Sequence, residues 1–164
     1  MTGLPSTLWL VRHGQSEGNV AHSTAEAAGA TAIQIEGRDV DVPLSALGER
    51  QALALGAWFA RQPQERRPTV VLSSPYARAR RTAQLVADAA GLTPFDSRSS
   101  DERLREKEFG ALNRLTRAGI LVHFPEEARR RAEIGKFYYR RWRRKLVRRA
   151  APPAEPARST SAAQ

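Results

Sequence analysis

Short apolar runs alternate with helical segments over residues 7–95, and this alternation constrains the fold more than any other feature. Apolar runs predict strands at 7–14, 67–75 and 92–95. Helices are predicted at 46–62, capped by Ser45, and at 76–91, stopped by Gly91. This order of elements is typical of α/β domains with a mostly parallel sheet. We therefore expect a three-layer α/β/α sandwich.

The expected core face of the helix over 46–62 follows from helical spacing. We expect it to contain Leu47, Leu55, Trp58 and Phe59.

The charge of the chain is concentrated at its end. The whole chain carries a formal net charge of +10, and residues 140–164 hold 8 of its 27 Lys and Arg but 1 of its 17 acidic residues. We therefore expect an α/β domain over 1–139 and a basic, Pro/Ala/Ser-rich, disordered tail over 140–164. Nucleic-acid binding through this tail is a third functional hypothesis, and a single Trp among its arginines makes it the weakest.

The composition also excludes several classes of site. The chain has no Cys, so it can form neither disulfides nor thiolate metal sites, and we expect a cytoplasmic protein. No apolar run is long enough to span a membrane, and the three histidines lack metal-ligand spacing, so we expect neither a membrane partner nor a metal.

Polar residues follow each predicted strand. Arg12 and His13 end the first strand, Arg78 follows the second, and Glu106 lies beyond the third. Ligands of parallel α/β sheets bind beyond the carboxyl ends of the strands, so these side chains are expected on one rim. Two guanidinium groups suit a phosphate, neutral imidazole is a nucleophile, and a carboxyl group can move a proton. Gly14 leaves room for phosphate beside the backbone.

Four sequence blocks resemble the histidine phosphatase superfamily, which includes the cofactor-dependent phosphoglycerate mutases. The blocks are LVRHGQSEGN, GRDVDVPLSALGERQA, SSPYARARRTA and LREKEFG. The resemblance implies the phosphoglycerate mutase-like fold. It also implies hydrolysis of a small-molecule phosphate ester through a phosphohistidine, without a cofactor.

The resemblance further implies a role for each site residue. His13 is the implied nucleophile, Arg12 and Arg78 bind the phosphoryl group, and Glu106 transfers the proton. Substrate-binding positions are implied for Gly14, Ser16, Asn19 and Arg38.

The resemblance ends at Arg140, and no histidine follows His123. A second pocket histidine on a late strand, which the resemblance implies, is therefore absent from this sequence. We hypothesise a truncated gene or a shifted reading frame, with impaired catalysis as the consequence. The alternatives are a remnant that binds phosphorylated ligands without turnover and a mutase that transfers the phosphoryl group. The sequence indicates neither the substrate nor the oligomeric state.

Overall fold

The structure is a computed structural model that describes residues 6–92, 96, 99–107 and 109–138. The predicted tail over 140–164 and most of the predicted strand over 92–95 lie outside these residues. The described α-helices are α1 (Glu17–Ala27), α2 (Ala46–Ala60), α3 (Ala77–Ala90), α4 (Arg117–His123) and α5 (Pro125–Ile134). Short 3₁₀ turns stand between these helices and after α5: η1 (Asp39–Asp41), η2 (Gln64–Arg66), η4 (Glu102–Leu104), η5 (Gly110–Leu112) and η6 (Gly135–Phe137).

The two central helices form where the sequence predicts them. The Ser45 hydroxyl accepts the N–H of Gly48 and so caps the start of α2. Gly91 ends α3 in the left-handed conformation, with φ of 62°. The prediction of both helices is therefore confirmed.

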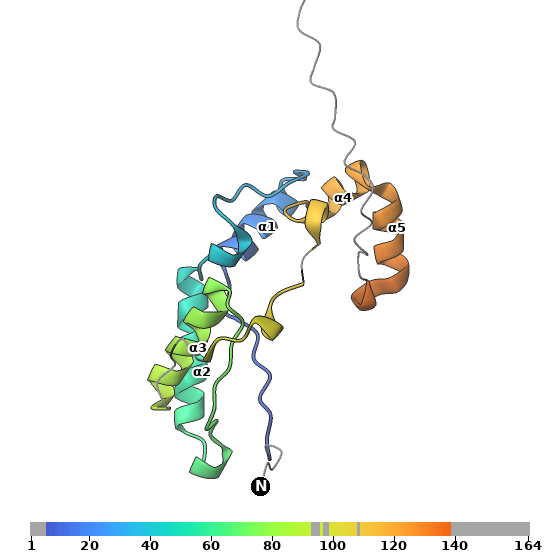
Figure 1. Cartoon of the computed structure of the whole chain (residues 1–164). Coiled ribbons are helices and arrows are strands. Elements are labelled where there is room, and N and C mark those ends of the chain that lie inside the picture. The colour runs from blue at the N-terminus through green and yellow to red at the C-terminus, as the bar shows by residue number, and fades with distance from the viewer. Residues whose placement is uncertain (1–5, 93–95, 97–98, 108, 139–164) are drawn as a thin grey trace, which may run out of the picture.

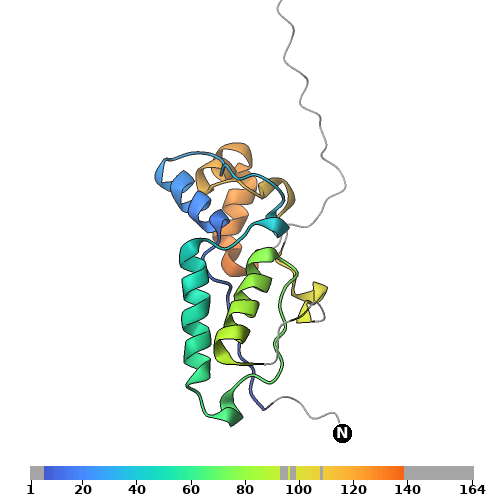
Figure 2. The same cartoon turned by 90° about the vertical axis from the view of Figure 1, so that its left-hand side faces the viewer.

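Helices α2 and α3 lie side by side in both views (Figures 1 and 2). Their contact is centred on small residues, since a Cβ added to Gly56 would lie 2.6 Å from the Cβ of Ala89. The buried cluster at this contact consists of Leu44, Ala52, Phe59, Leu85, Val86 and Ala90. This cluster is the main core of the described chain.

The expected core face of α2 is partly wrong. Phe59 is buried and Leu55 packs against the core, but Leu47 is 41% exposed and Trp58 is 37% exposed. The small residues Ala52 and Gly56 are buried instead. Because α3 packs closely against α2, only small side chains fit between the two helices. The hydrophobic pattern alone therefore predicted the core face of α2 incorrectly.

Around α4 and α5 lies a second buried cluster, made of Leu112, Ile120 and Tyr138. It lies at the end of the molecule away from α2 and α3 in Figure 1. The segment that leads into α4 is bound to the segment after α1 by two hydrogen bonds. Thr116 N–H donates to the Thr31 carbonyl oxygen at 3.1 Å, and Ile33 N–H donates to the Arg114 carbonyl oxygen at 2.8 Å.

Within the described residues, no strand ladder forms, so the predicted sheet is not seen there. The segments over 6–15 and 68–74 run as extended threads toward α1 and α3 (Figure 1). Ser73 makes one parallel bridge to Ser100, and the other two isolated bridges are antiparallel. A strand exists only where a neighbouring backbone receives its hydrogen bonds along its length. In the described chain, the backbone–backbone hydrogen bonds of the two threads are confined to Gln15 and Ser73.

Both threads remain partly uncovered. Trp9 packs edge to face on Trp58 and Phe59, whereas Leu10 beside it is 89% exposed. Val70 on the other thread is 72% exposed. One side of each thread thus carries apolar side chains with no packing partner in the described chain. Among the described helices, none combines the length and apolarity needed to cross a membrane.

Candidate active site

His13 lies at the end of the first thread with a defined hydrogen bond. Its Nδ1 lies 2.7 Å from the backbone oxygen of Gly14. A carbonyl oxygen only accepts, so Nδ1 carries the proton in this arrangement. The neutral ring then leaves the lone pair of Nε2 available, which is the atom that a nucleophilic histidine needs.

The turn after His13 is held by α2 and α3. Gly14 N–H donates to the Thr82 hydroxyl at 3.1 Å, and Gln15 N–H donates to Oε1 of Gln51 at 2.9 Å. A Cβ added to Gly14 would lie 2.3 Å from the carbonyl oxygen of Gly48. Gly14 is therefore required by the close approach of two backbones, in addition to the phosphate access expected from sequence.

Arg78 is the buried cation of the candidate site. Its Nη1 donates to the Asp39 carbonyl oxygen at 2.7 Å, and its Nη2 lies 3.3 Å from Oδ2 of Asp39. The guanidinium also lies over the ring of Tyr76, 4.5 Å from the centroid. These contacts fix the orientation of Arg78, and a phosphate would have to share the guanidinium with Asp39.

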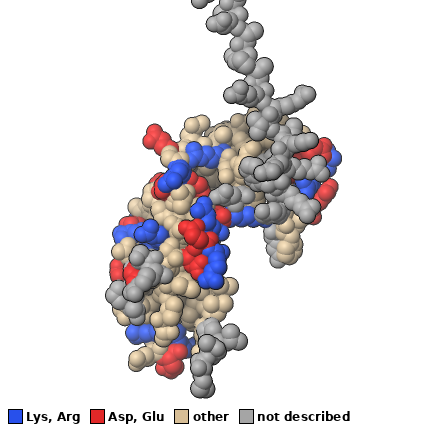
Figure 3. Space-filling view, in the orientation of Figure 1, with Lys and Arg blue, Asp and Glu red and all other residues tan. Residues whose placement is uncertain are grey.

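Glu106 is brought directly to Arg78. Its Oε2 lies 3.6 Å from Nη2 of Arg78, although the two residues belong to separate segments. The Glu106 side chain is 53% exposed, so it can exchange protons with solvent. Figure 3 shows acidic and basic side chains next to one another in the middle of the inner curve of the molecule.

Two of the four predicted catalytic residues line a hollow, whereas Arg78 and Glu106 are not among the lining residues of that hollow or of the larger pocket beside them. Arg12 and His13 line a hollow of about 120 Å³ beside α2 and α3. A larger pocket of about 350 Å³ adjoins Arg78 and Glu106 and is lined by Arg38, Asp39, Val40, Tyr76, Arg105, Lys107 and Asn113. Neither of these two hollows is lined by all four residues.

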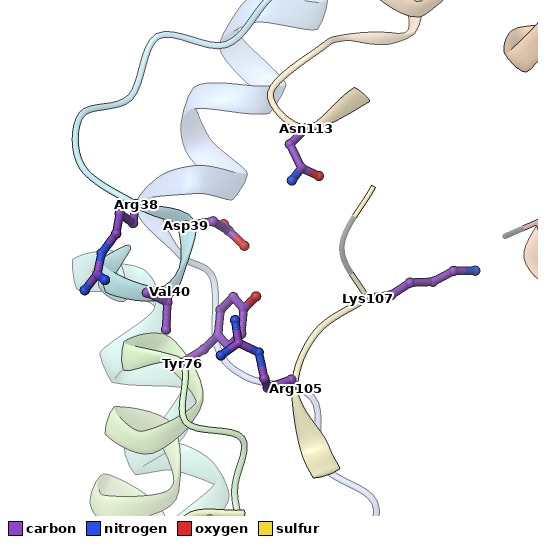
Figure 4. Close-up of a pocket in the computed structure, with 7 residues that line it drawn as sticks. All are labelled: Arg38, Asp39, Val40, Tyr76, Arg105, Lys107 and Asn113. Carbon is purple, nitrogen blue, oxygen red and sulfur yellow. The ribbon is translucent and has the colours of Figure 1, made fainter. Parts of the chain in front are cut away.

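The larger pocket is polar, and three of its seven lining residues are cationic. In Figure 4 the side chains of Asp39, Tyr76 and Asn113 extend toward its middle, whereas Arg38 and Lys107 extend away from it. Arg105 lies 5.6 Å from the centroid of the Tyr76 ring, on which Arg78 also lies. Tyr76 therefore carries two guanidinium groups at the edge of the pocket.

Three predicted substrate-binding residues have structural contacts. Ser16 is buried and caps α1, where it and Asn19 form a reciprocal capping box. Arg38 is exposed, and a hydrogen bond from its side chain to Asp41 raises the pKa of the Arg38 guanidinium. The substrate-binding role of these residues stays a prediction.

Sequence reasoning missed Thr82 and Asp39, which contact Gly14 and Arg78 respectively. Thr82 had a usable signal, because it follows Arg78 by four residues and so lies on the same helix face. Asp39 had none, since its contact joins segments far apart in the chain. Within the described ranges, no group of three or more His, Cys, Asp or Glu could hold a metal ion.

Comparison with known proteins bears on this arrangement. The sequence pattern of the histidine phosphatase superfamily (branch 1) matches residues 8–141. This chain belongs to that superfamily. The match covers the first thread from residue 8, the whole second thread, the helices α1 to α5 and every residue predicted for the site.

Named relatives and a solved structure agree with this histidine phosphatase assignment. A probable phosphoglycerate mutase GpmB of Serratia proteamaculans is 36% identical over 105 residues, which are 64% of this chain and 40% of that protein. The corresponding protein of Klebsiella pneumoniae is 33% identical over 111 residues, with 65% and 40% covered. The structure named mycobacterial hydrolase 1 is 30% identical, has a TM-score of 0.50 and covers 70% of this chain and 44% of its own.

The family and the solved structure support a phosphoglycerate mutase-like α/β fold for this histidine phosphatase. They also support an enzyme of the phosphatase or mutase type. The chain spans about two fifths of the length of the curated relatives that it matches.

Proposed function

We propose that this chain hydrolyses a small-molecule phosphate monoester through a phosphohistidine at His13. The observation that carries the proposal is the 2.7 Å contact between Nδ1 of His13 and the Gly14 carbonyl oxygen. This contact holds the proton on Nδ1 and leaves the lone pair of Nε2 available to attack a phosphorus atom. The buried Arg78 and the neighbouring Glu106 supply the charge and the proton that the reaction needs.

The first step follows from these roles. Nε2 of His13 attacks phosphorus, the P–O bond to the alcohol breaks, and Glu106 in its protonated form donates a proton to the leaving oxygen. Arg12 and Arg78 hold the equatorial oxygens of the transferring group, because guanidinium donors match their charge and spacing. Arg78 keeps its Asp39 contact only in part when it binds the anion.

The second step reverses these roles. Glu106, now a carboxylate, accepts a proton from water as the water oxygen attacks phosphorus. The N–P bond breaks, inorganic phosphate leaves, and Nε2 of His13 regains its lone pair. No metal or cofactor enters either step, and we place the reaction in the cytoplasm, as the absence of Cys favours.

The test is phosphoenzyme formation on the purified chain. We expect para-nitrophenyl phosphate to release phosphate and to leave a phosphoryl group on His13, detected by mass spectrometry at alkaline pH. His13→Ala should abolish both signals, whereas His22→Ala, a change on the exposed face of α1, should retain them. Phosphate release that persists in His13→Ala would contradict the proposal.

Two alternatives concern turnover. The relatives are named as probable mutases, which favours transfer of the phosphoryl group to an acceptor alcohol as the second candidate. Phosphoryl transfer that exceeds phosphate release would favour it. Phosphate binding without release would indicate a ligand-binding remnant.

A further inference from the structure

Thr82 connects the two halves of the candidate site. It lies on α3 one turn after Arg78, and both side chains are buried. Its hydroxyl donates to the Arg78 carbonyl oxygen at 2.8 Å and accepts Gly14 N–H at 3.1 Å. One hydroxyl group thus joins the backbone of the arginine-bearing helix to the backbone beside His13.

The direction of these bonds is determined. A hydroxyl group has one proton, and the Arg78 carbonyl can only accept it. The lone pairs of Thr82 are therefore free to receive Gly14 N–H. Without this acceptor, Gly14 N–H would be a buried donor with no partner of its own, since the nearby carbonyl of Gly48 approaches the Cα side of Gly14.

The position of the His13 ring depends on this backbone. Nδ1 of His13 contacts the carbonyl of Gly14, the same residue whose N–H is held by Thr82. A shift of Gly14 therefore moves the imidazole and the carbonyl that fixes its tautomer. The rate of attack on phosphorus is sensitive to such shifts, because the reacting atoms must be aligned at close approach.

We propose that Thr82 is a positioning residue that sets the place of His13 relative to Arg78. This inference rests on the proposed function for its kinetic consequence. The structural consequence, that Thr82 immobilises the turn over His13 and Gly14, is independent of the proposed function.

The test compares four proteins: the unaltered chain, Thr82→Val, Thr82→Ser and Thr116→Val. Valine keeps the shape of threonine and removes the hydroxyl, and serine restores the hydroxyl without the methyl group. Thr116 is a matched control, because its buried hydroxyl also joins two backbone groups, donating to Ala30 at 2.6 Å and accepting Gly119 N–H at 3.0 Å. Each protein is measured for hydrogen exchange at the Gly14 amide, for thermal unfolding, and for kcat and KM with para-nitrophenyl phosphate.

We expect Thr82→Val to speed exchange at Gly14 by about tenfold or more, as loss of a buried hydrogen bond implies. Its kcat should fall by about tenfold to a hundredfold with KM little changed, because Arg78 still binds the phosphate. Thr82→Ser should recover most of the slow exchange at the Gly14 amide and most of the kcat of the unaltered chain. Thr116→Val should lower the unfolding temperature and leave Gly14 exchange and kcat unchanged.

Two results would overturn the inference. One is unchanged Gly14 exchange in Thr82→Val, and the other is an equal fall in kcat in Thr116→Val, which would indicate general destabilisation. If the unaltered chain neither releases phosphate nor forms a phosphoenzyme, the proposed function fails. Gly14 exchange would then still decide whether Thr82 holds the turn.

Discussion

Single residues of this site act through contacts that join distant segments. Arg78 meets Asp39 and Glu106, and Gly14 meets Thr82, with each pair drawn from separate parts of the chain. From residue types and motif order, the sequence predicted a role for each of Arg78, His13 and Glu106, and these roles stay predictions. It could not predict that Asp39 occupies the guanidinium of Arg78, since no local pattern encodes that contact.

Asp101 provides a prediction about pH. Its N–H donates to the Ser73 carbonyl at 2.9 Å, and the hydrogen bond from Arg103 lowers the pKa of its carboxyl from 3.8 to about 2. A lowered pKa in the folded state means that the stabilisation is complete above pH 3.8 and is lost as the pH falls toward about 2. Arg103→Gln should return the carboxyl pKa toward its ordinary value, as measured by carbon NMR titration.

The control for this titration is Arg105→Gln. Arg105 pairs with Glu102 at 3.3 Å, so its replacement should leave the titration of Asp101 unchanged. An Asp101 midpoint that stays near pH 2 in Arg103→Gln would show that the backbone, and not the guanidinium, holds the carboxylate.

At the scale of elements, the helices were the predictable part. Caps, stops and spacing defined α2 and α3 because these signals are local. The core face of α2 was less predictable, since a small residue is buried only where another helix comes close. The strands were the least predictable, because a strand depends on a partner that can lie anywhere in the chain.

Gly56 tests the close contact between α2 and α3. Alanine normally stabilises a helix relative to glycine by about 1 kcal/mol, but here its Cβ would lie 2.8 Å from the Val86 carbonyl oxygen. We expect Gly56→Ala to lower the free energy of unfolding by about 1–3 kcal/mol, measured in urea. Gly18→Ala in α1 is the control, because its nearest contact is 3.4 Å and it should be neutral or stabilising. Equal effects of the two changes would contradict the packing argument.

At the scale of the whole molecule, the extended threads leave apolar side chains uncovered. Leu8, Leu10, Val70 and Leu72 are all more than half exposed, which is unusual for segments that resemble buried strands. Exposed apolar residues on an extended segment favour association with other chains. The sequence predicted these segments as strands because their apolar composition is visible in it, whereas their neighbours in space are not.

Leu10→Lys tests this association. We expect the variant to stay monomeric at concentrations where the unaltered chain self-associates, as measured by sedimentation velocity. Its unfolding temperature should change little, because Leu10 is 89% exposed. Trp9→Ser is the contrasting change, since Trp9 packs on Phe59 and its loss should lower that temperature. Unchanged self-association in Leu10→Lys would mean that another surface drives it.

The two buried clusters share no residue, and this separation affects how the chain resists proteases. The cluster at α2 and α3 can stay closed while the cluster at α4 and α5 opens, because each excludes water by itself. Once the cluster at α4 and α5 opens, protease cleavage would release peptides from residues 109–138 first. The part that carries His13 and Arg78 would survive longer, as a core fragment that still contains the proposed nucleophile and the proposed phosphate-binding arginine.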